Sequence, residues 1–143
     1  MFSRHESGSC AMSTKVVRLQ HASVPMPVGG NDEARAFYGG ILGFPEVLPP
    51  STLNRNRLVW YALGPDGHEL HVFAEEGFGP NSPRQHLCIQ VEDVVAFRKL
   101  VEDAGIETLE EPPIHNRPRF SLRDPFRNRI EITQILGAYD EFE

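Results

Sequence analysis

One unit occurs twice in the 143-residue sequence, and this repeat constrains the fold more than any other feature. The first copy opens with VRLQHASVPMP at residues 17–27 and continues through the segment 31–44. The second opens with RQHLCIQVED at 84–93 and continues through 94–107. Each copy ends in two strand-like runs, LVWYALG and HELHVF in the first, PRFSLRD and NRIEIT in the second. The sequence therefore predicts two similar modules.

Each copy contains one amphipathic helix. Its apolar residues recur at i, i+3, i+4 and i+7, which places them on one helical face. They are Ala34, Phe37, Tyr38 and Ile41 in the first copy, and Phe97, Leu100, Val101 and Ala104 in the second. Gly43 and Gly105 follow as helix-ending glycines. Gly39 and Gly40 weaken the first helix, since each glycine costs on the order of 1 kcal/mol relative to alanine.

The other segments are short, rich in β-branched or aromatic residues and bounded by turn formers, which is typical of strands. They are 16–25, 44–48, 57–62, 68–74, 84–91, 106–110, 118–122 and 129–135. Each copy thus reads β-α-β-β-β, and the fold class is α+β. We expect βαβββ modules at 15–78 and 82–137 that together make one domain, forming a cupped mixed sheet with one main helix per module. Residues 1–14 are predicted to be a disordered tail, and they lack the apolar run of a secretory signal.

Composition and charge exclude some partners. A net charge of −6 leaves no broad basic surface for nucleic acid. No run approaches the roughly 18 to 20 apolar residues that span a bilayer, so we expect no membrane segment. Two cysteines make no disulfide framework, which favours a reducing, cytoplasmic setting. Five arginines gather late in the chain, where they predict either binding of an anionic substrate or ordinary local salt bridges. They are Arg117, Arg119, Arg123, Arg127 and Arg129.

Metal-binding side chains occupy matched positions in the two copies. Strand alternation puts Leu87 and Ile89 on one face and His86 on the other, and His21 aligns with His86. The last strands align His71 with Glu131. A single strand histidine is more often structural than a ligand, and Glu131 alone would be an ordinary outward-facing charge. Three imidazoles and one carboxylate at repeat-matched positions nevertheless predict a divalent-metal site.

The chain resembles the vicinal oxygen chelate superfamily, which includes glyoxalases, bleomycin resistance proteins and extradiol dioxygenases. The resemblance covers about residues 16–136 and is carried by QHASVPMP with ARAFYGGILGF, by HLCIQVEDV with the second helix, and by RPRFSLRDPFRNRIEI. In that family the first and last strands of each module supply the metal ligands, which implies His21, His71, His86 and Glu131 here. The expected cofactor is one divalent ion: Zn, Ni, Fe, Mn or Co.

The resemblance implies a lyase or isomerase of the glyoxalase type, whose ion chelates vicinal oxygens of a small organic substrate. Glu131 and His71 are the expected catalytic residues, Glu131 moving a proton α to a carbonyl and His71 acting as a ligand or second base. Glyoxalase I enzymes carry a carboxylate where this chain has His71. An extradiol-type dioxygenase using His21, His86 and Glu131 is therefore one alternative, and a metal-free drug-binding module is another.

The remaining expectations concern the substrate and the assembly. Trp60, Tyr61, Phe120 and Arg119 are predicted to line the substrate cup. Alternation requires one of the adjacent Trp60 and Tyr61 to face it, while ordinary core packing is the competing interpretation for the aromatic residues. We expect a homodimer. The sequence leaves open whether the two modules pair within one chain or across the dimer.

Overall fold

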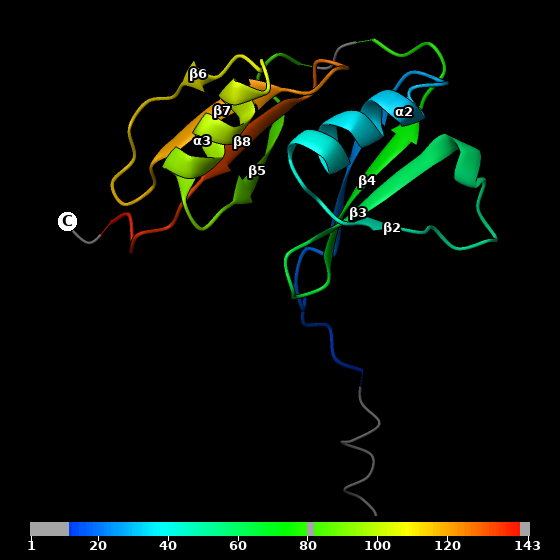
Figure 1. Cartoon of the computed structure of the whole chain (residues 1–143). Coiled ribbons are helices and arrows are strands. Elements are labelled where there is room, and N and C mark those ends of the chain that lie inside the picture. Colours follow the sequence, from blue (N-terminus) through cyan, green and yellow to red (C-terminus); the bar gives the residue numbers. More distant parts are fainter. Residues whose placement is uncertain (1–11, 80–81, 141–143) are drawn as a thin grey trace, which may run out of the picture.

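Two four-stranded mixed sheets, each backed by one helical segment, make up the computed structural model, which describes residues 12–79 and 82–140 (Figure 1). The first module comprises β1 (His21–Met26), α2 (Asn31–Ala34), η1 (Arg35–Ile41), β2 (Glu46–Val47), η2 (Arg55–Arg57), β3 (Leu58–Leu63) and β4 (His68–Ala74). The second comprises β5 (His86–Gln90), α3 (Val94–Asp103), β6 (Leu109–Glu110), β7 (Arg119–Arg123) and β8 (Arg129–Thr133). The predicted pair of βαβββ modules is confirmed. Residues 1–11 of the predicted tail lie outside the described part.

The two sheets share one topology. Their strand orders are β1-β4-β3-β2 and β5-β8-β7-β6, with the first pair parallel and the others antiparallel. Ser23 lies opposite His71 in the first sheet, and Cys88 lies opposite Glu131 in the second. His71 and Glu131 therefore hold equivalent positions. His21 and His86, each two residues before the Ser or Cys, are equivalent too.

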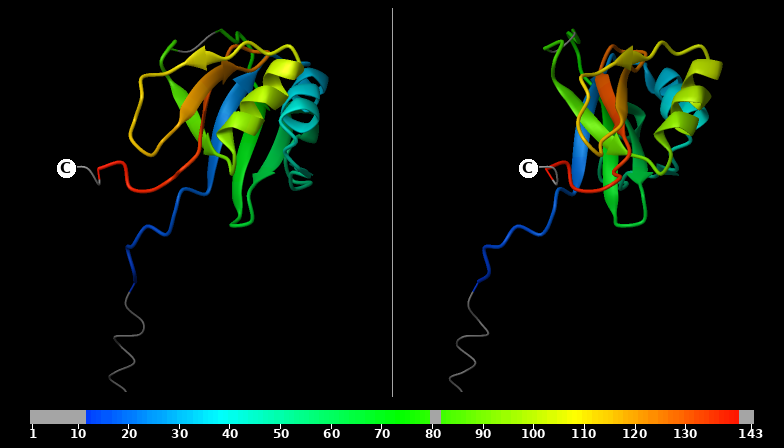
Figure 2. Two further views of the ribbon diagram at one scale, coloured as in Figure 1. Left: turned by 60° about the vertical axis from the view of Figure 1, so that its left-hand side comes forward. Right: turned by 90° about the vertical axis from the view of Figure 1, so that its left-hand side faces the viewer.

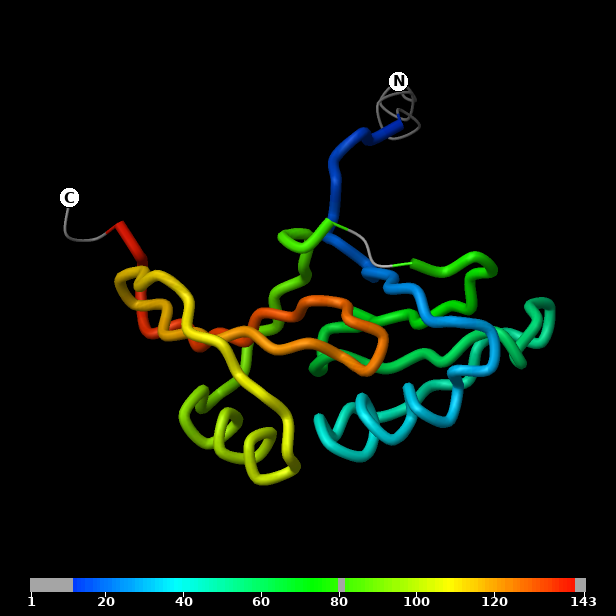
Figure 3. Tube along the Cα trace, turned by 90° about the horizontal axis from the view of Figure 1, so that it is seen from above, coloured from blue at the N-terminus to red at the C-terminus, as the bar shows by residue number. Residues whose placement is uncertain are grey.

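Apolar rows on the helix side form the core. Leu70 and Val72 of β4, and Ile130 and Ile132 of β8, are fully buried. Figures 2 and 3 show both helices on one side of the sheets. Residue 71 of β4 and residue 131 of β8 therefore point away from the helices, because successive strand residues alternate in direction.

The first helix departs from the regular helix that its spacing predicts. It is α-helical only over α2 and continues as the π-helix η1, which contains Gly39 and Gly40. A π-turn is rare because it widens the backbone. The two glycines reduce the steric cost, and the Tyr61 ring packs 3.7 Å from the position that a Cβ of Gly39 would take. α3 is regular, and the Asp93 side chain caps it by accepting a hydrogen bond from the Ala96 amide at 3.0 Å.

A buried polar cluster joins the modules. The Tyr38 hydroxyl of η1 donates to Asp124 Oδ2 in the β7–β8 turn at 2.6 Å, and Asn128 Nδ2 donates to the Pro25 carbonyl of β1 at 2.9 Å. Asp124 Oδ1 also accepts from the backbone amides of Phe126 and Asn128. The aspartate and asparagine of the DPFRN segment therefore hold the second module against the first. Among the described residues, no helix is long and apolar enough to cross a membrane.

Candidate metal centre

The first half of the candidate site is a stack of three rings on the open face of the first sheet. The His71 ring lies 3.7 Å from Trp60, nearly parallel to it at 2°, and 4.0 Å from His21 at 19°. His71 Nε2 donates to Glu69 Oε1 at 2.8 Å, which leaves Nδ1 as the nitrogen with a lone pair. Burial lowers the pKa of His71, His21 lowers it further, and the Glu69 carboxylate partly opposes the shift. His71 is therefore held as a neutral, oriented imidazole.

His21 and His86 have matching hydrogen bonds at the ring nitrogen nearer the backbone. His21 Nδ1 donates to Gln20 Oε1 at 2.7 Å, and His86 Nδ1 donates to the Arg84 carbonyl at 2.8 Å. Both acceptors fix the ring tautomer, so Nε2 carries the lone pair when the ring is neutral. Metal-binding histidines typically show this arrangement, because the outer hydrogen bond orients the ring.

The second half of the site brings a carboxylate to His86. His86 Nε2 lies 3.2 Å from Glu131 Oε1, while Arg119 Nη1 lies 3.1 Å from Glu131 Oε2. Arg119 is fixed in turn, since its Nε and Nη2 donate to the Pro112 carbonyl at 3.2 and 2.8 Å. Desolvation and the Glu131 carboxylate raise the pKa of the Cys88 thiol to about 12, although Cys88 as a whole is exposed. One carboxylate oxygen is thus held by Arg119, and the other faces His86.

The donor chemistry of this half fits a divalent ion. With His86 Nδ1 committed to a carbonyl, a lone pair on Nε2 faces a carboxylate lone pair at 3.2 Å, and this contact is repulsive unless a cation lies between them. Two ligands that each lie about 2.1 Å from one ion are about 3.0 to 3.4 Å apart. The His86–Glu131 spacing falls in that interval. A proton on Nε2 is the other cation that would satisfy the pair.

One chain does not gather the full ligand set. Within residues 12–79 and 82–140, no group of three or more His, Cys, Asp or Glu side chains is placed to hold one ion. The structure brings His21 together with His71, and His86 together with Glu131, but it leaves the two pairs on separate sheets.

The predicted substrate residues divide between two faces. Trp60 lies on the open face beside His71, and Arg119 lies beside Glu131. Tyr61 and Phe120 are 0% and 1% exposed within the helix-side core, which corrects the expectation that they line the cup. The physical reason is alternation, because Trp60 faces outward and its neighbour Tyr61 must face inward. The indole nitrogen of Trp60 is buried and has no hydrogen-bond partner among the described residues.

Most of the late arginines form local contacts. Arg129 pairs with Glu111 at 2.6 Å, and Arg123 donates to the carbonyls of Arg127 and Pro83. Arg117 lies over the Tyr139 ring at 5.0 Å. The Ser121 hydroxyl donates to Glu111, and this bond, together with Arg129, lowers the pKa of Glu111. The sequence analysis did not identify Glu111, which directly follows β6 and belongs to no strand of the second module.

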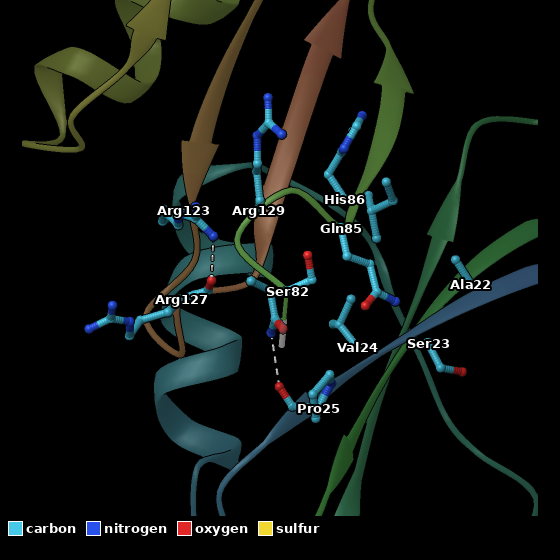
Figure 4. Close-up of a pocket in the computed structure, with 12 residues that line it drawn as sticks. Ala22, Ser23, Val24, Pro25, Ser82, Gln85, His86, Arg123, Arg127 and Arg129 are labelled. Atoms are coloured by element: carbon cyan, nitrogen blue, oxygen red, sulfur yellow. Dashed lines mark hydrogen bonds between the residues drawn. The ribbon is translucent and has the colours of Figure 1, made fainter. Parts of the chain in front are cut away.

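Two hollows lie between the modules. A cavity of about 190 Å³ separates β1 from β5, and Figure 4 shows His86 and Arg129 rising from its wall away from Pro25. A larger, mostly apolar groove of about 1320 Å³ runs from the His21 end of the first sheet to β5 and α3. Both hollows follow from the separation of β1 and β5, which are edge strands of different sheets.

Comparison with known proteins identifies the family. The model of the glyoxalase/bleomycin resistance protein/dioxygenase superfamily matches residues 18–132. The chain belongs to this superfamily, the vicinal oxygen chelate superfamily expected from its sequence. None of the curated proteins compared with it is a significant match.

Solved structures agree with this assignment. A glyoxalase family protein from Bacillus anthracis is 31% identical with a TM-score of 0.78, and the match covers 87% of this chain and 99% of that one. A glyoxalase/dioxygenase from Nostoc punctiforme is 19% identical with a TM-score of 0.71, covering 89% and 100%. TnmS3, an antibiotic binding protein from Streptomyces sp. CB03234, is 22% identical with a TM-score of 0.64, covering 86% and 99%. The latter two likenesses show the vicinal oxygen chelate fold alone.

Proposed function

We propose that this chain is a divalent-metal-dependent enzyme of the glyoxalase type, which binds vicinal oxygens of a small organic substrate and moves a proton. The observation that carries the proposal is the contact of His86 Nε2 with Glu131 Oε1 at 3.2 Å, with His86 Nδ1 committed to the Arg84 carbonyl. Two such facing acceptors need a cation. The family makes a metal ion the first candidate.

His21, His86 and Glu131 would hold the ion, Zn, Ni, Fe, Mn or Co, with His71 as a fourth ligand or a nearby base. The ion would supply Lewis-acid stabilisation of a developing oxyanion on the substrate. Arg119 holds Glu131 Oε2, so Oε1, which faces His86, would be the ligand atom and, when released from the ion, the atom that accepts a proton from the substrate. His71 is oriented by Glu69 through Nε2, so its Nδ1 is the atom that can hold or release a second proton.

The two halves of the ligand set require an assembly that joins them. We propose a homodimer in which His21 and His71 of one copy meet His86 and Glu131 of the other, since one chain keeps the pairs apart. Trp60 would then form an apolar wall of the site, and Arg119 would fix its carboxylate. We place this enzyme in the cytoplasm, in line with its free Cys88 thiol.

The test is metal content and affinity. Protein purified without added metal is analysed for metals, stripped, and titrated with Zn²⁺, Ni²⁺ and Mn²⁺ by calorimetry. The His86→Ala variant is expected to lose tight binding. The His68→Ala variant is the matched control, because His68 also donates through Nδ1 to a carbonyl, that of Leu19 at 2.7 Å, but pairs with no carboxylate of the described residues. Equal affinity in the two variants would defeat the proposal, and so would the absence of binding in the unmodified chain.

A dioxygenase is the second candidate, and one observation favours it. The His71 ring already stacks on His21 and Trp60 and is bonded to Glu69 through Nε2, which suits an acid–base residue beside the ion. That leaves His21, His86 and Glu131 as a two-histidine, one-carboxylate set of the kind found in non-haem Fe(II) oxygenases. Oxygen uptake by the iron-loaded protein with catechols would support this reading over the isomerase. A protein that binds no metal but binds drug-like ligands would support a sequestering module instead.

A further inference from the structure

Glu131 has two arginines within reach on the open face of the second sheet. Arg119 Nη1 lies 3.1 Å from Glu131 Oε2. Arg129 precedes Glu131 by two residues on β8, so both side chains stand on the same face, about 6.6 to 7 Å apart along the strand. A long arginine side chain can reach across that distance, and its guanidinium forms strong hydrogen bonds with carboxylates. If both arginines paired with Glu131, neither carboxylate oxygen would remain for a metal ion.

Arg129 pairs with a different carboxylate. Its Nη2 donates to Glu111 Oε2 at 2.6 Å, and the side chains of Arg129 and Glu111 are only 16% and 11% exposed. Ser121, which is fully buried and lies opposite Glu131 in the β7–β8 register, donates to the same Glu111 oxygen at 2.6 Å. The bonds from Ser121 and Arg129 lower the pKa of Glu111, so this group is a carboxylate at neutral pH. Glu131 Oε1 is thereby left facing His86.

The same guanidinium also supports the orientation of His86. Arg129 lies directly opposite His86 in the β5–β8 register, and Figure 4 shows the two side chains beside each other. Arg129 Nη1 donates to the Arg84 carbonyl at 3.3 Å, and this carbonyl also accepts from His86 Nδ1 at 2.8 Å. A carbonyl oxygen has two lone pairs and can accept from both donors. The position of Arg129 therefore affects both His86 and Glu131.

We infer that Glu111 is a positioning residue of the candidate metal centre. Its carboxylate holds Arg129 away from Glu131 and, through Arg129, supports the Arg84 carbonyl that orients His86. Without the Glu111 charge, Arg129 would pair with Glu131 and take the oxygen that faces His86. The effect on metal binding rests on the proposed function, whereas the placement of Arg129 requires no metal.

The first test compares variants of the full chain by calorimetric titration with Zn²⁺. Glu111→Gln keeps the shape but removes the charge, and it should weaken zinc binding by about 10- to 100-fold, the range typical of residues that support metal ligands. Glu110→Gln is the matched control, because Glu110 also pairs with an arginine, Arg98 of α3 at 2.7 Å, but has a side chain that is 81% exposed. Equal zinc affinity of the two variants would overturn the inference.

A second substitution separates the control of Arg129 from a merely structural role. Arg129→Gln removes the support of the Arg84 carbonyl but leaves no cation at position 129 to compete for Glu131, so it should weaken zinc binding less than Glu111→Gln. Adding Arg129→Gln to Glu111→Gln should then restore the affinity to that of Arg129→Gln alone. Two independent structural losses would add instead. A double variant that binds zinc no better than Glu111→Gln would therefore overturn the inference.

Crystal structures of the apo wild type and of apo Glu111→Gln supply a readout that needs no metal. The wild type should show the pair of Arg129 with Glu111, and the variant should show Arg129 paired with Glu131. If the wild type binds no zinc but the variant shows the new pair, the proposed function fails and the role of Glu111 in placing Arg129 stands. A variant in which Arg129 does not pair with Glu131 overturns the inference, whether or not zinc binds to the wild type.

Discussion

Replacing Tyr38 by Phe removes the single hydroxyl that ties η1 to the β7–β8 turn. Tyr38 is 0% exposed and Asp124 is 4% exposed, so water cannot replace the lost bond. A hydrogen bond to a charged group is worth about 1.5 to 3 kcal/mol. Asp124 Oδ2 keeps one donor, Asn128 Nδ2 at 2.7 Å, which argues against a larger loss. At about 2 to 4 °C per kcal/mol for a chain of this size, Tm should fall by about 3 to 12 °C.

The loss should depend on pH. Burial raises the pKa of Asp124, while the Tyr38 hydroxyl lowers it. A carboxyl group whose pKa is raised on folding contributes stability below its unfolded pKa of about 3.9, and this contribution disappears as pH rises through the folded pKa. Removing the hydroxyl raises the folded pKa further. The deficit of Tyr38→Phe should therefore be larger at pH 7 than near pH 4.

Scanning calorimetry of the apo protein at both pH values measures the effect. Tyr61→Phe is the control, because Tyr61 is equally buried but donates to a neutral acceptor, the Ala34 carbonyl, at the longer distance of 3.3 Å. Its cost should be about 0.5 to 1.5 kcal/mol. Two results would contradict this account of the Tyr38–Asp124 hydrogen bond. One is that Tyr38→Phe lowers the free energy of unfolding no more than Tyr61→Phe does, and the other is that its loss of stability does not grow toward neutral pH.

Three further predictions concern the candidate site. Glu131→Gln keeps the shape but removes the charge, so calorimetry should show at least about tenfold weaker metal binding, and unchanged affinity would contradict the ligand role. Glu69→Gln should lower the pKa of His71 further, because the charged hydrogen bond that raises it is lost; NMR titration of the apo protein measures this shift, and a raised pKa would contradict it. Trp60 is the only tryptophan and stacks on His71, so metal titration should change its fluorescence in the wild type, and an unaltered spectrum on metal binding would contradict a shared site.

Local periodicity predicted the fold because each module repeats one pattern. The helix-facing rows follow from alternation along single strands, and the matching of the copies gives the equivalent positions of His71 and Glu131. Alternation shows that Trp60 and Tyr61 face opposite ways but not which of them faces the core. Comparison across strands decides this, since Trp60 lies opposite His71. Glu111 reaches the site region from a loop and could not be found from any strand pattern.

The same register explains why the two copies differ where the site lies. With His71 equivalent to Glu131, the β3 residues Trp60 and Leu58 are equivalent to Ser121 and Arg119 of β7.

Glu131 is 7% exposed, and a carboxylate at this depth requires a countercharge, which Arg119 supplies. His71 is 9% exposed and stacks on Trp60, an arrangement that suits a neutral imidazole and needs no cation. A glutamate at position 71 would meet an indole and a leucine in place of a serine and an arginine. The imidazole of His71 and the carboxylate of Glu131 are therefore each matched to the side chains on the adjacent strand. The two modules differ at these neighbouring positions of β3 and β7 as well as at the candidate ligand itself.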